Sequence, residues 1–309
     1  MAIGSGIGSQ LGIATETTFN TPVTVSTFYE FTNESINYNK NISVGLGLRA
    51  GGQVARSGRR VVTSSDATGD INLDLPTKGL GLLLSHAMGG TIQTSGTYTL
   101  GDVYGKSFTA QVGVPQYGGT VTPKTIAGCK VSSFEIAAAQ NAIATGRFTI
   151  DGASFTTGTA LATASFPSAN SVFHFAQGSI TVDGSSVANI KDFTLTVDNT
   201  LKTDRFNLGS AGIKAEQIIN GFRTISGSLT AEFTDTTLLS KFLADTSAAI
   251  VLSFAGTSSS ALSITLPAVK FDGEAPQVGG PEVIDINFTF QAYDDGTNQP
   301  LTIVYTPTA

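Results

Sequence analysis

Polar and apolar residues alternate along most of this chain, and a period of two predicts β-strands joined by turns. The clearest case is the stretch 67–87, ATGDINLDLPTKGLGLLLSHA, in which an alternating strand leads directly into a short apolar helix. The strand buries Ile71, Leu73 and Leu75, and the helix buries Leu80, Leu83, Leu84 and Ala87. Two glycines in the helix, each costing about 1 kcal/mol relative to alanine, make it dependent on docking against the rest of the protein.

The same strand-to-helix step recurs at 224–245, TISGSLTAEFTDTTLLSKFLAD. Four pairs of positions are each 158 residues apart: Gly69 and Gly227, Leu75 and Phe233, Leu80 and Leu238, Leu84 and Phe242. The order strand, long loop, strand, helix and further strands also recurs. The pattern predicts a tandem duplication, with a first domain at 1–152, a linker or extended connection at 153–170 and a second domain at 171–309.

Several segments lack a clear period. The glycine-rich start, Gly4–Gly12, is expected to be a mobile N-terminal arm. Residues 39–66 and 199–222 are expected to be long irregular loops, a length that is uncommon in compact domains and is usually functional. Asp183 and Gly184 separate two apolar runs and predict a hairpin turn.

Composition favours an assembly of β-structure. Thr, Ser, Val, Ile and 19 Phe dominate, there is no Trp, and only 13% of the residues are charged, against about 25% in a typical soluble protein. Such a low charge content indicates that much of the surface contacts partners. The net charge of −6 argues against a general nucleic-acid binder, although acidic groups beside DNA would repel it.

The residues offer little chemistry for catalysis or metal binding. A lone Cys129 excludes an intrachain disulfide and a cysteine zinc site. His86 is expected to be a cation at the end of the first helix, and His174 an ordinary strand residue. Asp294 and Asp295 in AYDDGTNQP suit a turn better than a calcium site. No catalytic residue, cofactor or metal ion is therefore predicted.

One basic cluster stands out in the first long loop. It consists of Lys40, Arg49, Arg56, Arg59 and Arg60. Solvation of an ordinary surface loop and contact with an acidic neighbouring subunit explain it equally well. Binding of DNA ranks third, because no aromatic residues are interleaved as stacking platforms.

The sequence carries neither a signal-peptide pattern at its start nor an apolar run of membrane-spanning length. We therefore expect a soluble protein that is made in a cytoplasm and has no membrane partner.

Several stretches together resemble the major tail tube proteins of long-tailed bacteriophages. GSQLGIATETTFNTPVTVSTFYEFTNESI, LRAGG, SGRR and ATGDINLDLPTKGLGLLLSHAMG are similar to the N-terminal half of that family. ITVDGSSVANIKDFTLTVDN, FRTISGSLTAEFTDTTLLSKFL and LPAVKFDGEAP are similar to the C-terminal half. The resemblance implies a mainly β protein with two tandem β-sandwich or β-barrel tail-tube domains, each with one short flanking helix and a long loop.

The resemblance also implies a function. The chain would be a structural virion protein of the phage tail, assembled in the host cytoplasm into stacked rings that conduct the genome into the host cell. Because each chain would hold two domains, rings of three chains with pseudo-sixfold symmetry are favoured over rings of six. Other tail proteins would be partners, and DNA would pass without adhering.

Two sets of residues would serve such a tube. The basic cluster of the first long loop would contact other subunits or the next ring. Outward polar positions of the strands would face the lumen and repel DNA, and the candidates are Asp70, Asp74 and Glu232.

Two other functions fit parts of the sequence. The first is a virion or cell-surface β-sandwich protein that binds a receptor or carbohydrate, which the scattered Tyr residues disfavour. The second is a β-rich hydrolase. The lack of a convergent acid, base and nucleophile set disfavours that more strongly, although the members of a Ser–His–Asp triad are scattered in sequence and leave no local pattern.

Overall fold

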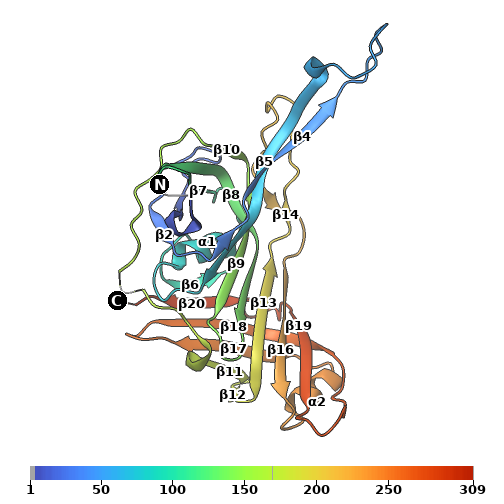
Figure 1. The fold of residues 1–309 in the computed structure, drawn as a ribbon. Coiled ribbons are helices and arrows are strands. Elements are labelled where there is room, and N and C mark those ends of the chain that lie inside the picture. Colours follow the sequence, from blue (N-terminus) through green and yellow to red (C-terminus); the bar gives the residue numbers. More distant parts are fainter. Residues whose placement is uncertain (1–3, 169, 309) are drawn as a thin grey trace.

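The computed structural model describes residues 4–168 and 170–308 of the 309-residue chain (Figure 1). Residues 1–3, position 169 of the predicted connection and position 309 lie outside the described residues.

The described residues of the first half form one α-helix among their strands. The elements of this half are η1 (Gly6–Gly8), β1 (Gln10–Thr15), β2 (Thr27–Tyr29), β3 (Asn33–Glu34), β4 (Asn37–Val44), η2 (Ser57–Arg59), β5 (Arg60–Asp74), α1 (Gly81–Met88), β6 (Gly96–Thr99), β7 (Phe108–Pro115), β8 (Val121–Ala138), β9 (Thr145–Gly152) and β10 (Ser154–Thr156).

In the second half, residues 170–308 also include one α-helix. The elements of this half are η3 (Phe175–Gln177), β11 (Gly178–Val182), β12 (Ser185–Ser186), β13 (Ile190–Asp198), β14 (Leu201–Lys202), β15 (Ile218–Ile219), β16 (Thr224–Glu232), α2 (Thr237–Leu243), β17 (Ala248–Ala255), β18 (Ala261–Gly273), β19 (Asp285–Ala292) and β20 (Thr302–Thr306). The predictions of a mainly β fold and of a short helix after each repeated strand are confirmed.

A long antiparallel sheet runs through both halves of the chain. Its strands follow the order β4-β5-β9-β8-β13-β16-β19-β18. The pairing of β8 with β13 joins the halves, and Phe134 lies opposite Val197 in it. The sheet therefore continues from one half into the other without a break in its hydrogen-bonded ladder.

A second layer of strands packs over this sheet in each half. In the first half its order is β2-β1-β7-β8-β10, and in the second it is β12-β11-β17-β18-β20. β8 and β18 are long enough to belong to both layers of their half. Every pairing in the first list therefore has a counterpart in the second, in the same order along the chain.

The two glycines of the repeated step have the same structural role. A Cβ atom on Gly69 would lie 2.5 Å from the Cα atom of Ile36, and one on Gly227 would lie 2.1 Å from the carbonyl oxygen of Thr194. In both cases the backbone of the preceding strand approaches too closely for any side chain. Glycine therefore recurs at this register because the close approach of the neighbouring backbone recurs.

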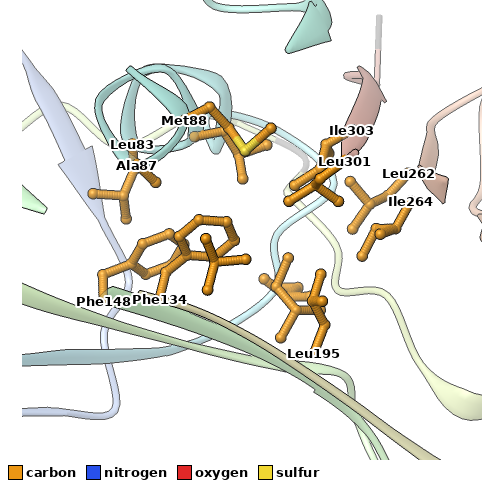
Figure 2. Close-up of a cluster of buried hydrophobic side chains, with 14 of the residues drawn as sticks. Leu83, Ala87, Met88, Phe134, Phe148, Leu195, Leu262, Ile264, Leu301 and Ile303 are labelled. Atoms are coloured by element: carbon orange, nitrogen blue, oxygen red, sulfur yellow. The ribbon is translucent and has the colours of Figure 1, made fainter. Parts of the chain in front are cut away.

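The hydrophobic core joins the two halves, as Figure 2 shows. Leu83 of α1 lies on the side of Phe134 and Phe148 of the long sheet, and Met88 of the same helix lies toward Ile303 of the last strand. The cluster drawn there comprises Leu83, Ala87, Met88, Phe134, Phe148, Leu195, Leu262, Ile264, Leu301 and Ile303, among others. All eight residues of α1 are buried, so docking supplies the stability that its sequence lacks.

The prediction of an irregular loop at 39–66 is wrong for residues 39–44 and 60–66, which belong to strands, whereas residues 45–56 form no helix or strand. Residues 37–44 and 60–74 form the long hairpin of β4 and β5, which extends away from the body of the molecule (Figure 1). We call residues 37–66 the projecting hairpin and residues 45–56 its tip. Outer strand positions such as Ile42 and Val61 are exposed on both strands, so no alternation of buried and exposed residues marks them in the sequence.

The prediction of a mobile arm over Gly4–Gly12 is wrong at its C-terminal end. β1 begins at Gln10 and pairs with β7, and Leu11 is completely buried. A Cβ atom on Gly12 would lie 2.8 Å from a side-chain carbon of Val25, so this glycine allows close packing. The segment 153–170 starts with β10, which pairs with β8.

Candidate functional site

One face of the long sheet is polar from strand to strand. Residues directly opposite each other in paired strands point to the same face, so the registers define rows across the sheet. One row comprises Asn72, Arg147, Glu135, Thr196, Ser226 and Gln291, and the next comprises Asp74, Thr145, Ala137, Thr194, Ser228 and Thr289. We call this surface the polar face.

The opposite face of the same strands is apolar and buried. One of its rows comprises Ile71, Phe148, Phe134, Val197 and Ile225. The two faces therefore differ completely, as expected for an antiparallel sheet with one side on the core and one side away from it. The sequence period of two in stretches such as 67–75 has this origin.

The three predicted acidic residues lie on the polar face. Asp70 and Asp74 project from β5, and the carboxylate of Asp70 accepts a hydrogen bond of 2.6 Å from the Thr149 hydroxyl. Glu232 lies at the end of β16, 3.2 Å from the Nζ atom of Lys191. The structure thus brings these acids onto one surface, although they occupy different strands.

Further charged residues share this face, and acidic side chains outnumber basic ones. Asp66, Asp151 and Lys130 also lie on this face but form ion pairs with the segment 199–222. The other acids are Asp70, Asp74, Glu135, Asp192, Asp198, Glu232, Asp272 and Asp285, and the other bases are Arg147, Lys191 and Lys270. The ammonium group of Lys191 forms ion pairs with the carboxylates of Glu232 and Asp285, which offset its positive charge. Sequence reasoning missed most of these acids because their common face depends on strand pairing.

The predicted basic cluster lies on the projecting hairpin. Lys40 is on β4 with its Nζ atom 5.2 Å from the ring centre of Tyr38, and Arg49 is in the tip. Arg56, Arg59 and Arg60 follow where the chain returns into β5. All five basic residues are exposed, so the hairpin presents them to the surroundings.

The tip of the hairpin is also apolar and exposed. Leu46, Leu48 and Val54 are each at least four-fifths exposed. They line a shallow groove made only of tip residues. A segment that combines exposed leucines with arginines far from the core has the character of a contact surface.

The second irregular segment, 199–222, packs against the first half of the chain. Lys214 is fully buried with its Nζ atom 2.6 Å from Asp151 and 3.1 Å from Asp66. Lys130 forms a second buried ion pair of 2.6 Å with Glu216. Burial raises the pKa of Asp151, and the bond from Lys214 opposes that rise. These contacts fasten the loop to β8 and β9.

His86 is not a cation at the end of the first helix, and that prediction is wrong. Its Nε2 atom lies 2.9 Å from the hydroxyl of Thr15, and its ring packs against Phe108. Burial, with a smaller contribution from the charge of Lys130, lowers its pKa to about 4. The imidazole is therefore neutral at pH 7 and belongs to the core.

The remaining chemical candidates take ordinary structural roles. Asp295 accepts hydrogen bonds from the backbone N–H groups of Thr297 and Asn298, as the predicted turn requires. Within residues 4–168 and 170–308 no group of three or more His, Cys, Asp or Glu side chains is arranged to hold a metal ion. In the same residues no helix has the length and apolarity needed to cross a bilayer.

Comparison with known proteins agrees with the geometry. The family described as "Phage tail tube protein" matches residues 6–292, which is nearly the whole chain. No curated protein matches the chain significantly. The sheet with one polar and one buried face is thus the scaffold of a structural component of the virion tail, and the chain belongs to the phage tail tube protein family.

Proposed function

We propose that three copies of this chain close into a ring, that rings stack into a tube, and that the tube conducts the phage genome into the host cell. Assembly takes place in the host cytoplasm together with other tail proteins. The polar face of the long sheet lines the lumen. The observation that carries the proposal is this sheet, which is polar on one face, buried on the other and continuous across both halves of the chain.

The matched strand order supports two tandem tail-tube domains, 1–152 and 171–309, joined by the connection 153–170. Each domain contributes four strands to the long sheet, namely β4, β5, β9 and β8 or β13, β16, β19 and β18. A chain with two such units occupies two positions of a ring. Three chains then give pseudo-sixfold symmetry, whereas six chains would give a ring twice as large.

The dimensions of such a barrel suit a DNA conduit. Three chains contribute two dozen strands, and a spacing of about 4.8 Å gives a circumference of about 115 Å and a diameter of about 37 Å before strand tilt widens it. Acidic groups of the polar face, including Asp70, Asp74 and Glu232, then surround the lumen. Their negative potential keeps the phosphate backbone from adhering.

The projecting hairpin suits the contact between successive rings. It carries the basic cluster Lys40, Arg49, Arg56, Arg59 and Arg60 together with the apolar tip residues Leu46, Leu48 and Val54. Buried apolar side chains would hold the contact, and the arginines would select acidic partner surfaces.

Cryo-electron microscopy of the purified protein tests this proposal. We expect rings or tubes in which each ring contains three 31.8-kDa chains and the polar face lines the lumen. Six chains per ring would contradict the trimer. A protein that remains monomeric at high concentration would contradict a tube function altogether.

A further inference from the structure

The pairing of β8 with β13 joins the two halves of the long sheet within one chain. The strands at the two ends of that sheet have no such pairing in the described part of the chain. The long sheet consists of two sets of four strands with the same neighbours, β4-β5-β9-β8 and β13-β16-β19-β18. The last strand of the first set pairs with the first strand of the second set. The two strands left at the ends of the sheet are β4 and β18.

No strand covers the outer side of β4 in the described part of the chain, although Lys124 donates a hydrogen bond of 3.4 Å to the carbonyl of Ile36 just before that strand. Among those residues β4 pairs only with β5. The backbone N–H of Ser35 donates to Asp70 of β5, so the N–H of the next residue, Ile36, points away from that strand. It donates instead to the Glu34 carboxylate at 2.7 Å. A side chain thus occupies the place of a neighbouring strand's carbonyl group.

The end of β18 is the second free edge. β8 remains a strand as far as Ala138, where β13 lies beside it. β18 ends at Gly273, and the residues that follow have no strand partner in the described chain. Glu274, Ala275 and Gln277 are exposed, and so is Val278. β18 therefore ends short of the length that β8 reaches beside β13.

We propose that residues 272–277 of one chain pair with residues 34–39 of the next chain, antiparallel and in the register that β8 and β13 show. Gly273 and Phe134 both lie opposite a phenylalanine of the adjacent strand, Phe288 and Phe148 respectively. Those two phenylalanines lie in turn opposite Leu229 and Ile71, which are 158 positions apart. Gly273 is therefore the counterpart of Phe134.

The register of the partner strand follows in the same way. Tyr38 lies opposite Ala67, and Val197 lies opposite Ile225. Ala67 and Ile225 are again 158 positions apart, so Tyr38 is the counterpart of Val197. Because Phe134 faces Val197, the inference places Gly273 opposite Tyr38 of the next chain. Glu274 then lies opposite Asn37, Ala275 opposite Ile36 and Pro276 opposite Ser35.

The position of Pro276 supports this register. The N–H of Asn199 donates to the carbonyl of Ser132 at 2.8 Å, which fixes the alternation of hydrogen-bonded pairs along β8 and β13. In that alternation Ala137 and Thr194 do not exchange hydrogen bonds. Pro276 is the counterpart of Ala137, so it needs no N–H toward the next chain. Proline is tolerated in a ladder only at such a position.

A cavity in the second half provides a separate argument. It lies between β11, β13 and β17, is lined by Ile180, Phe193 and Leu252 among others, and is walled by Ala138 at the end of β8. The equivalent groove of the first half is lined by Glu34 and Val112 and has no wall from β18. Residues 277 and 278 of the next chain would supply this missing wall, and the exposed Val278 would be its apolar contact.

Engineered disulfides test the inference, which rests on the proposed ring. Glu274→Cys and Asn37→Cys are made in separate chains, and the chains are mixed, assembled and oxidised. The native Cys129 is buried and its pKa is raised by burial, so it does not interfere. Glu135→Cys with Thr196→Cys in one chain is the positive control, because that pair occupies the same register inside the chain. Glu274→Cys with Asn41→Cys is the off-register control.

We expect the mixed Glu274→Cys and Asn37→Cys chains to form covalent dimers, and a chain carrying both changes to form covalent closed trimers. The off-register pair is displaced by about 13 Å and should cross-link at least about tenfold less, since a disulfide needs Cβ atoms about 4 Å apart. Rings that assemble normally without cross-linking at this register would overturn the inference but leave the proposed function intact. Absence of rings from the unsubstituted protein would overturn both.

Discussion

The Nζ atom of Lys214 lies 2.6 Å from the carboxylate of Asp151, and both side chains are buried. Lys214 belongs to the segment 199–222 of the second half, and Asp151 belongs to β9 of the first half. A third group, Asp66 of the projecting hairpin, lies 3.1 Å from the same Nζ atom. One lysine therefore ties the second irregular segment to two strands of the first half.

Replacing Lys214 by methionine should destabilise the protein strongly. The change leaves the buried Asp151 without its cationic partner, and breaking a buried pair in this way costs about 3–5 kcal/mol of unfolding free energy. Urea denaturation of the monomer measures this loss. The matched control is Lys202→Met, which breaks the exposed pair with Asp204 and should leave the denaturation midpoint nearly unchanged. Equal midpoints for the two variants would contradict a clamping role for Lys214.

The alternating segments of the chain could be predicted because each has one face on the core. Stretch 67–75 reads directly as a strand, since Ile71 and Leu73 are buried and Asn72 and Asp74 are not. The recurring 158-residue offset likewise identified strands with matching neighbours. The local sequence pattern is sufficient to predict a strand wherever buried and exposed residues alternate along it.

Other features depend on contacts that no local pattern records. The projecting hairpin was missed because residues such as Ile42 and Val61 are exposed on paired strands, so neither face shows a hydrophobic period. The pairing of Phe134 with Val197 joins positions 63 residues apart and leaves no mark in either strand. The common face of the acidic residues follows only from such pairings, so its full membership could not be read from the sequence.

Reversing the charges of Arg59 and Arg60 to glutamate should impair the stacking of rings while leaving the fold intact. Both side chains are exposed on the projecting hairpin and far from the core, so the unfolding midpoint should stay close to that of the unsubstituted protein. Tube length in negative-stain micrographs measures the effect. Lys202→Glu with Lys241→Glu makes the same change in net charge elsewhere and should leave tubes normal. Normal tubes from the Arg59 and Arg60 variant would refute the stacking role.

The two α-helices should differ sharply in their sensitivity to truncation. Leu83 of α1 is completely buried between the layers, and Leu83→Ala should cost about 2–5 kcal/mol of unfolding free energy. Leu243 of α2 is 69% exposed, and Leu243→Ala should cost less than about 0.5 kcal/mol in the monomer. Chemical denaturation of both variants measures the difference. Similar losses would show that α1 is not the better-docked helix.

Stability should fall as the pH drops from about 6.5 to about 4 because of His86. Its folded pKa of about 4 lies below the value of about 6.5 expected in the unfolded chain, so the unfolded chain binds the extra proton first in this range. The contribution of His86 to the unfolding free energy is fully present above the unfolded pKa of about 6.5. By a pH of about 4 the unfolding free energy has fallen by about 3 kcal/mol.

Unfolding free energies of the unsubstituted protein and of His86→Gln, measured at several pH values, isolate this contribution from that of the carboxylates. The variant should show a shallower decline between pH 6.5 and 4. Parallel curves for the His86 variant and the unsubstituted protein would contradict a buried neutral imidazole.

Replacing Asp70 and Asp74 by lysine should turn a passive lumen into one that holds DNA. Both side chains project from β5 on the polar face, so each ring gains positive charge at its inner wall if that face lines the lumen. Phosphate groups then displace counterions on binding, which makes the retention of DNA strong at low salt and weak at high salt. DNA retained by purified tubes, measured against NaCl concentration, reports the effect. The control Glu30→Lys with Asp294→Lys changes the net charge equally at exposed positions in the β2–β3 and β19–β20 connections, outside the strands of the long sheet, so DNA bound to the outer wall would appear in both variants. Equal retention by the two variants would place the polar face outside the lumen.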